Sequence, residues 1–259
     1  MSSGMQLLDI RLQRGQTTVF DGLNLKLQQK RIGVIGNNGA GKSSLFRLLC
    51  GLEIPQTGQV LMGGAELLQA RQHNPGLVGL MFQNPDDQII FPTVEEELAL
   101  GLRPKGLNKQ QAKAKARELL NERGLAHWAE RAVSSLSQGQ RQQVCWLSLL
   151  IASPQVLLLD EPFASLDLPG QARLARDIAA APQQILVSTH VLDHVRDFER
   201  VIWLEQGKLR GDGPGREVCS AYETAVAAEI SAELAASLNP SNAAPPHATT
   251  PQTGEPHHG

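Results

Sequence analysis

Residues 36–43 read GNNGAGKS. It follows a short β-branched run, RIGVIG at residues 31–36, and precedes Leu45, Leu48 and Leu49 at helical spacing. A glycine-rich segment between a strand and a helix is typical of a phosphate-binding loop, in which main-chain amides and the helix N-terminus supply partial positive charge. The sequence therefore predicts a polyphosphate site on an α/β core.

The residue types within this loop indicate its chemistry. Glycine permits backbone conformations that other residues avoid, so the main chain can approach a polyphosphate closely. We expect Lys42 to reach the β and γ phosphates and Ser43 to offer its hydroxyl oxygen to Mg²⁺. The predicted nucleotide-binding residues of the loop are Gly36, Asn37, Asn38, Gly39, Ala40, Gly41, Lys42, Ser43 and Ser44.

A second motif, VLLLDEP at residues 156–162, ends an apolar strand in two adjacent carboxylates. Neighbouring side chains at the end of a strand point to opposite sides of the sheet, which predicts different roles for the two acids. Asp160 is expected to hold the water shell of Mg²⁺ across from Ser43, and Glu161 to orient and polarise the attacking water. Taken alone, the motif could equally be a solvated strand end.

A third motif, LSQGQ at residues 136–140, precedes a helical stretch. Ser137 is a good N-cap, Gly139 permits close backbone approach, and the helix start makes a second anion site. Taken alone, this is only a helix cap. Two phosphate sites far apart in one chain suggest that one nucleotide is clamped between two copies of the protein.

The rest of the chain predicts an α/β fold, with a P-loop NTPase core of mostly parallel sheet flanked by helices. Strict alternation of Leu23, Leu25 and Leu27 adds an antiparallel β subdomain, and helix formers dominate an inserted α-helical subdomain at about residues 84–153. The uninterrupted apolar runs at 156–159 and 185–187 indicate strands buried on both faces. The expected divisions are an ATPase domain at 1–220, a C-terminal helix at 221–238 and a disordered tail at 239–259.

Composition limits the class of partner. Lys and Arg number 24 against 26 for Asp and Glu, so the net charge of −2 provides no general attraction to nucleic acid or an anionic membrane. Basic residues gather in 103–131 without interleaved aromatic residues, and we expect no nucleic-acid partner. The three cysteines lack metal-ligand spacing, and the tail histidines are not expected to hold a metal. No apolar run reaches the ~18 residues of a spanning helix, which predicts a cytoplasmic protein.

The order of these motifs over about residues 5–215 resembles that of the nucleotide-binding subunits of ATP-binding cassette proteins. The matching elements are GNNGAGKS, Gln83 in MFQNP, LSQGQ, VLLLDEP, ASLD at 164–167 and His190 in VSTH. This resemblance implies that ATP and Mg²⁺ are the cofactors. It also implies that Gln83 lies near Mg²⁺ and that His190 contacts the γ-phosphate, which adds both to Glu161 as candidate catalytic residues.

The same resemblance implies a dimer. Asp167 would lie at the dimer seam, and Ser137 and Gly139 would act on nucleotide held by the opposite protomer, with Gln140 counted among the nucleotide-binding residues. Departures from the family pattern are few: Gln138 stands for the usual Gly and Ser44 for the usual Thr. At the position of the aromatic adenine platform the chain has Arg14, which could stack on a base or be a solvated turn residue.

Residues 82–101, FQNPDDQIIFPTVEEELALG, are similar to the ATPases of energy-coupling factor importers for vitamins and transition-metal ions. This likeness implies that the segment after Gln83 lies beside a groove that receives a transmembrane scaffold protein. An acidic patch that would suit basic coupling helices is predicted here, with a solvated acidic loop as the alternative. Its members are Asp86, Asp87, Glu95, Glu96 and Glu97.

The resulting hypothesis is an ATPase that powers uptake of a vitamin such as biotin, or of cobalt or nickel. It would act at the cytoplasmic face of the membrane, with scaffold and substrate-binding membrane subunits, as a homodimer or a heterodimer with a related ATPase. The alternative is a soluble ATPase of the same superfamily that acts in assembly or repair. A regulator that does not hydrolyse ATP conflicts with the intact Glu161 and His190.

Overall fold

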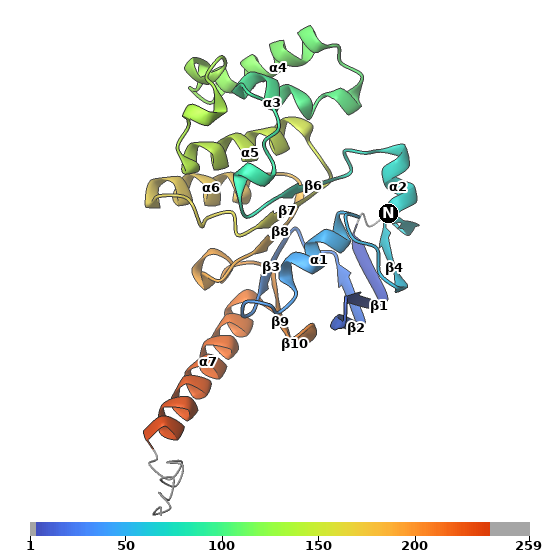
Figure 1. The fold of residues 1–259 in the computed structure, drawn as a ribbon, viewed down its shortest axis with the longest axis vertical. Coiled ribbons are helices and arrows are strands. Elements are labelled where there is room, and N and C mark those ends of the chain that lie inside the picture. The colour runs from blue at the N-terminus through green and yellow to red at the C-terminus, as the bar shows by residue number, and fades with distance from the viewer. Residues whose placement is uncertain (1–3, 239–259) are drawn as a thin grey trace, which may run out of the picture. The chain divides into compact units, whose positions relative to one another are not determined.

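The strands of this chain form two sheets in a computed structural model that describes residues 4–238 (Figure 1). Within those residues the smaller sheet is antiparallel, in the order β2-β1-β4-β5. Its strands are β1 (Met5–Arg14), β2 (Thr17–Leu27), β4 (Thr57–Met62) and β5 (Ala65–Glu66). The leucines at 23, 25 and 27 are buried on one face, as their alternation predicts.

The larger sheet has the strand order β10-β9-β3-β8-β7-β6 in the described part of the chain. All of its neighbouring strands run parallel except the β9–β10 hairpin. Its strands are β3 (Arg31–Ile35), β6 (Val78–Met81), β7 (Val156–Asp160), β8 (Gln184–Ser188), β9 (Arg200–Glu205) and β10 (Lys208–Gly213). The two apolar runs expected to form buried parallel strands are β7 and β8, which confirms the predicted α/β core.

Helices flank both sheets. The α-helices are α1 (Lys42–Leu49), α2 (Leu67–His73), α3 (Val94–Leu100), α4 (Lys109–Glu122), α5 (Gln138–Ala152), α6 (Leu168–Ala180) and α7 (Gly215–Leu238). Short 3₁₀ turns are η1 (Pro85–Asp87), η2 (Arg103–Lys105), η3 (Ala126–Trp128), η4 (Val133–Ser135) and η5 (Leu192–His194). No helix within residues 4–238 is both long enough and apolar enough to cross a bilayer.

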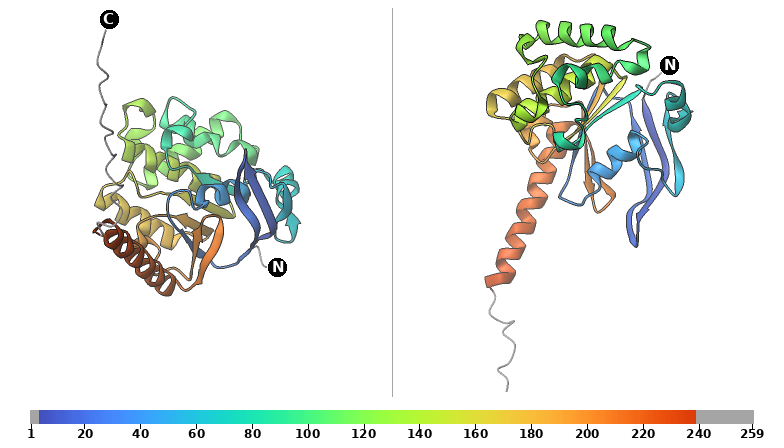
Figure 2. Two further views of the ribbon diagram at one scale, coloured as in Figure 1. Left: turned by 60° about the horizontal axis from the view of Figure 1, so that its bottom comes forward. Right: turned by 45° about the horizontal axis from the view of Figure 1, so that its top comes forward.

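Helix α1 packs between the two sheets (Figures 1 and 2). Leu45 and Leu48 are completely buried in a cluster that also contains Phe20 of the smaller sheet and Leu158 of the larger. Burial of each such side chain stabilises the fold by about 1.5–3 kcal/mol. The helix is therefore fixed against both sheets, and its N-terminal end is held at the edge of the larger one.

Helices α3, α4 and α5 enclose a second apolar cluster. Leu98 of α3, Leu120 of α4 and Val144 of α5 are completely buried within it, beside Trp128. Asn108 begins α4 with a capping box, because its side chain accepts from the main chain of Gln111 and the Gln111 side chain accepts in return. The helix formers between about residues 84 and 153 thus form packed helices.

Helix α7 begins earlier than the C-terminal helix predicted at 221–238. It starts at Gly215, because Val218 and Cys219 seat its first turns in the core. The chain divides into two compact units after Tyr222, so α7 belongs to both. The predicted tail at 239–259, with its histidines, lies outside the described residues.

Candidate nucleotide site

The carboxyl ends of the parallel strands bring the candidate residues to one edge of the larger sheet. Asp160 of β7 pairs with Ser188 of β8, which pairs with Val34 of β3, so these strands end level with one another. The phosphate loop follows β3, Gln83 follows β6 and His190 follows β8. Open α/β sheets bind ligands at this edge, where the loops after neighbouring strands converge.

Glycine is required at two positions of the phosphate loop. Gly36 has a φ of 142°, and a Cβ atom there would collide with the main-chain oxygen of Leu204. Gly41 caps α1 with a φ of 103° and lies against the ring of Phe20. Both conformations are strained for residues with a side chain. Glycine at these two positions therefore allows the main chain of the loop to line the cavity at the edge of the larger sheet.

Lys42 is the cation of this loop. Its Nζ donates to the main-chain oxygen of Gly36 at 2.7 Å and to that of Asn37 at 3.2 Å. Burial lowers the pKa of Lys42, and the nearby carboxylates of Glu161 and Asp160 oppose that lowering. The ammonium group is held by uncharged carbonyl oxygens, and an anionic group would bind it more strongly than they do.

Glu161 and His190 form a pair at the ends of β7 and β8. Oε2 of Glu161 lies 2.9 Å from Nδ1 of His190, and the glutamate is buried, whereas the histidine side chain is 65% exposed. Asp160 and Glu161 both line the same cavity. Glu161 lies just past the last residue of β7 and has a φ of 47°, which breaks the alternation of the strand.

The candidate residues described above line one cavity of about 1020 Å³. Every predicted residue of the phosphate loop lines it, together with Gln83, Asp160, Glu161 and His190. Arg14 also lines it, with its guanidinium bound to Glu53 by hydrogen bonds of 2.7 and 2.6 Å.

Further lining residues were not predicted from the sequence. They are Thr17, Thr18, Val19, Gln206, Gly207 and Tyr222. Gly207, in the turn between β9 and β10, donates its N–H to the main-chain oxygen of Ala40 at 3.1 Å and so supports the phosphate loop. Tyr222 could have been found, because Val218, Cys219 and Tyr222 have the spacing of one helix face.

The remaining candidates line a different cavity of about 660 Å³ between α5 and α6. These candidates are Ser137, Gly139, Gln140 and Asp167. Ser137 forms the predicted N-cap, as its Oγ accepts from the N–H of Gln140 at 3.3 Å, and Asp167 caps α6 through the N–H of Gly170 at 2.8 Å. Among the residues that the structure describes, none lines both cavities. A single chain therefore does not bring the two sets together.

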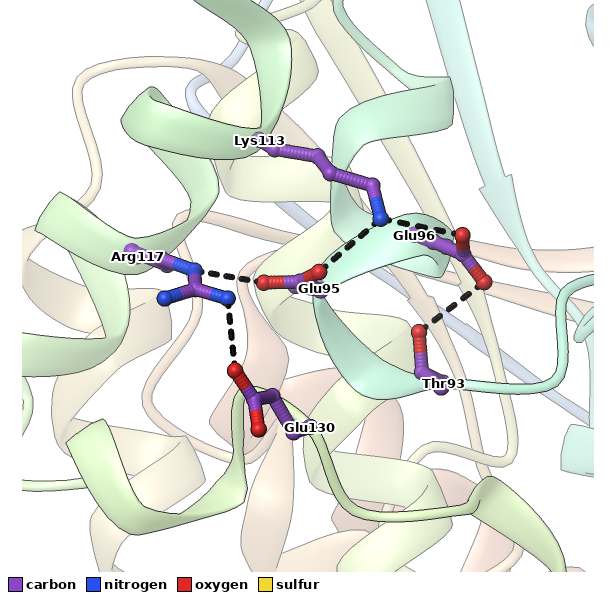
Figure 3. Close-up of polar contacts among 6 residues, drawn as sticks. All are labelled: Thr93, Glu95, Glu96, Lys113, Arg117 and Glu130. Atoms are coloured by element: carbon purple, nitrogen blue, oxygen red, sulfur yellow. Dashed lines mark hydrogen bonds and ion pairs between the residues drawn. The ribbon is translucent and has the colours of Figure 1, made fainter. Parts of the chain in front are cut away.

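The predicted acidic patch is wrong for Glu95 and Glu96, whose carboxylates are paired within the protein (Figure 3). Lys113 donates to both, at 2.9 and 3.0 Å, and Arg117 donates to Glu95 at 2.6 Å. Burial alone would raise the pKa of Glu95, but the hydrogen bonds from Arg117 and Lys113 outweigh burial and lower that pKa. These ion pairs join α3 to α4.

Glu97 does not belong to the acidic surface either, because its carboxylate is buried. Only 4% of the residue is exposed, and Oε2 accepts the N–H groups of Ile90 at 2.9 Å and Phe91 at 2.8 Å. Asp86 and Asp87 are exposed, and Asp86 lies 3.1 Å from Arg141. The acidic surface near Gln83 is therefore smaller than the sequence predicts.

Comparison with known proteins identifies the family. The family model described as ABC transporter matches residues 20–164. The chain is 45% identical to the biotin transport ATP-binding protein BioM of Rhodobacter capsulatus, over 86% of this chain and 97% of that protein. The chain belongs to the ABC transporter family. Members of this family hydrolyse ATP to power transport, so the protein binds ATP and is an ATPase.

Two further likenesses agree with this assignment. The chain is 37% identical to the energy-coupling factor transporter ATP-binding protein EcfA of Methanoculleus marisnigri, over 83% of this chain and 81% of that protein. The structure of cbiO1 from Clostridium perfringens, described as part of the ABC transporter complex cbiONQ, matches with a TM-score of 0.73 at 24% identity. The match covers 86% of this chain and 93% of the cbiO1 chain, which shows that the two proteins share a fold.

Proposed function

We propose that this protein is the ATP-hydrolysing subunit of an energy-coupling factor importer that takes up biotin. The observation that supports hydrolysis is the Glu161–His190 pair in the same cavity as Lys42. The importer type and the cargo are supported by relatives, since two proteins named biotin transport ATP-binding protein are 45% and 38% identical to this chain. These names favour biotin over cobalt or nickel, and an importer over a soluble ATPase.

The residues of the larger cavity fit ATP with Mg²⁺. Ser43, Gln83 and Asp160 contribute a hydroxyl, an amide and a carboxylate oxygen, and hard oxygen ligands are those that Mg²⁺ prefers. The bound ion would neutralise charge that develops on the phosphates. Lys42 and the loop amides hold the phosphate groups. Glu161 accepts a proton from the attacking water, and His190 orients the carboxylate of Glu161 through Nδ1–H. With both ring nitrogens protonated, His190 would also donate Nε2–H to a phosphate oxygen.

The second cavity is proposed to complete the site of a partner. Ser137, Gly139, Gln140 and Asp167 lie apart from the phosphate loop in one chain, so they reach nucleotide only if it belongs to another protomer. A head-to-tail pair of identical chains satisfies this requirement at two sites at once. A heterodimer with a related ATPase would satisfy it as well, and mixing two inactive variants of this chain separates an active homodimer from that alternative.

We place the membrane partner beside Gln83. Residues 84–153, taken as a helical subdomain inserted in an ATPase domain of residues 1–220, would receive a transmembrane scaffold at the cytoplasmic face of the membrane. The exposed carboxylates of Asp86 and Asp87 remain the acidic element of that surface. Replacing both by lysine is expected to detach the scaffold in a pull-down from solubilised membranes, with ATP affinity unchanged.

Transport tests the proposal directly. Cells that lack their own biotin uptake should accumulate labelled biotin when they express this protein with its membrane subunits, and the Lys42→Ala variant should not. Uptake of cobalt or nickel in place of biotin would overturn the proposed cargo. Recovery of soluble partners alone in the pull-down would overturn the importer assignment in favour of a soluble ATPase.

A further inference from the structure

Tyr222 connects helix α7 to the phosphate loop. It is the only tyrosine in the sequence, and its hydroxyl donates to Oδ1 of Asn37 at 2.6 Å. It also lines the larger cavity, together with the loop residues and Glu161. None of the motifs described above includes Tyr222, and the proposed function assigns it no role.

The position of the phenol ring is fixed by the core. The ring packs edge-on against Trp203 of β9, with centroids 5.2 Å apart and an interplanar angle of 87°. Trp203 pairs with Ile35, the last residue of the strand that leads into the phosphate loop. The preceding turn of α7 is anchored by Val218 and Cys219, which are 7% and 0% exposed. The Tyr222 hydroxyl is therefore held beside the loop by the packing of its ring and of the preceding turn of α7.

Asn37 is one of the two loop residues whose main-chain oxygens accept from Lys42, the other being Gly36. The main-chain oxygen of Asn37 accepts from the N–H of Ala40 at 3.1 Å and from Nζ of Lys42 at 3.2 Å. Its side chain, on the exposed side of the loop, is bound by Tyr222. A restraint on Asn37 is thus a restraint on the part of the loop that also positions Lys42.

We propose that Tyr222 is a positioning residue of the nucleotide site: its hydroxyl fixes Asn37, so that the loop holds its shape before a nucleotide arrives. A loop that is ordered in advance loses less conformational entropy on binding, and affinity rises accordingly. This inference rests on the proposed assignment of the loop as the nucleotide site. Tyr222 acts through Asn37 and takes no part in the hydrolytic step.

The first test compares MgADP affinities by calorimetry on the full chain. Tyr222→Phe keeps the ring against Trp203 and removes only the hydroxyl. One hydrogen bond of this kind corresponds to a loss of affinity of about three- to tenfold. Ser231→Ala is the matched control, because it removes a hydroxyl of the same helix that donates to the Ala227 carbonyl. Affinity of Tyr222→Phe within twofold of the wild type would overturn the inference.

A double-mutant cycle separates positioning from a general effect on folding. If the hydroxyl acts through Asn37, Tyr222→Phe should have no effect on MgADP affinity when Asn37→Ala is already present. Additive losses from the two substitutions would overturn the inference. Lys42→Ala separates the proposed nucleotide site from the proposed role of Tyr222. If Lys42→Ala binds MgADP with wild-type affinity, the assignment of the nucleotide site is wrong. If Lys42→Ala loses MgADP affinity and Tyr222→Phe does not, only the role of Tyr222 is wrong.

A second measurement needs no substitution at position 222. Protein produced with 3-fluorotyrosine carries one fluorine-labelled residue, because the chain has a single tyrosine. Its ¹⁹F resonance should shift when MgADP saturates the wild-type chain and should stay in place with Lys42→Ala. The resonance should also shift in nucleotide-free Asn37→Ala. A resonance that does not respond to saturating MgADP would contradict the proposal.

Discussion

Nδ1 of His190 lies 2.9 Å from Oε2 of Glu161, although the two residues follow different strands. The contact depends on parallel pairing of β7 with β8, which places Asp160 opposite Ser188. The N–H of Glu161 donates to the main-chain oxygen of Ser188 at 3.0 Å, so the pair is held by the main chain as well. A carboxylate fixed in this way is oriented before a water molecule meets it, which favours its use as a general base.

His190→Ala should lower the kcat of ATP hydrolysis more than it raises KM. The substitution frees the Glu161 carboxylate from its partner and removes a donor to phosphate, and the expected loss in kcat is on the order of 10²-fold. Steady-state ATPase assays measure both constants. His73→Ala is the control, since its ring contacts the main-chain oxygen of Gln69 on the surface of α2 and should leave both constants unchanged.

Mixing two inactive variants should restore ATP hydrolysis if each site uses two protomers. Lys42→Ala disables the phosphate loop, and Ser137→Arg blocks the N-terminus of α5, which lines the other cavity. In a mixed dimer, the loop of the Ser137→Arg chain faces the intact Ser137 of the Lys42→Ala chain, so one site is complete. Each variant alone should be inactive, and a mixture as inactive as its components would argue against shared sites in a homodimer.

Glu97→Ala should destabilise the protein by about 2–3 kcal/mol, because it leaves the N–H groups of Ile90 and Phe91 without their acceptor. Glu97→Gln keeps an acceptor oxygen and should lose less. Urea unfolding followed by circular dichroism gives the free energy of unfolding. Glu118→Gln, which alters an exposed pair with Lys115, is the control. Equal stability of Glu97→Ala and the wild type would mean that this carboxylate is not a structural acceptor.

Glu95 should make stability depend on pH in the acid range. Its pKa is lowered in the folded protein, so its ionised form stabilises the fold above the ordinary glutamate pKa, and this contribution is lost as the pH falls through the lowered value. Wild type should therefore exceed Glu95→Gln in free energy of unfolding at pH 7, and the difference should shrink between pH 5 and pH 3. Denaturant titrations across this range measure it. A difference independent of pH would show that the Lys113 and Arg117 contacts do not depend on charge.

The phosphate loop, Asp160 and Glu161 were expected from their own motifs, whereas Gln83 and His190 were expected from the family resemblance. The structure brings these residues to one cavity because β3, β6, β7 and β8 belong to one parallel sheet and their carboxyl ends lie at the same edge. The N-cap of Ser137 was also predictable, since a capping box is a local pattern that depends on residues three apart.

What the sequence did not predict depends on contacts between distant segments. The sequence at residues 95–97 is typical of an exposed acidic run. The packing of α3 against α4 instead pairs Glu95 and Glu96 with α4, and the carboxylate of Glu97 is buried. Tyr222 lies within the C-terminal helix predicted at 221–238, but its contact with Asn37 joins segments that are far apart in the sequence. The positive φ of Glu161, directly after the last residue of β7, is likewise not predicted by the alternation of a strand.

We propose that Glu161 activates the water that attacks ATP in the larger cavity. The most direct measurement is the rate of MgATP hydrolysis by purified Glu161→Gln, with bound nucleotide and oligomeric state recorded in the same samples. We predict that turnover falls by at least about 10²-fold while ATP stays bound and dimers accumulate. Hydrolysis by Glu161→Gln at the wild-type rate would contradict the account.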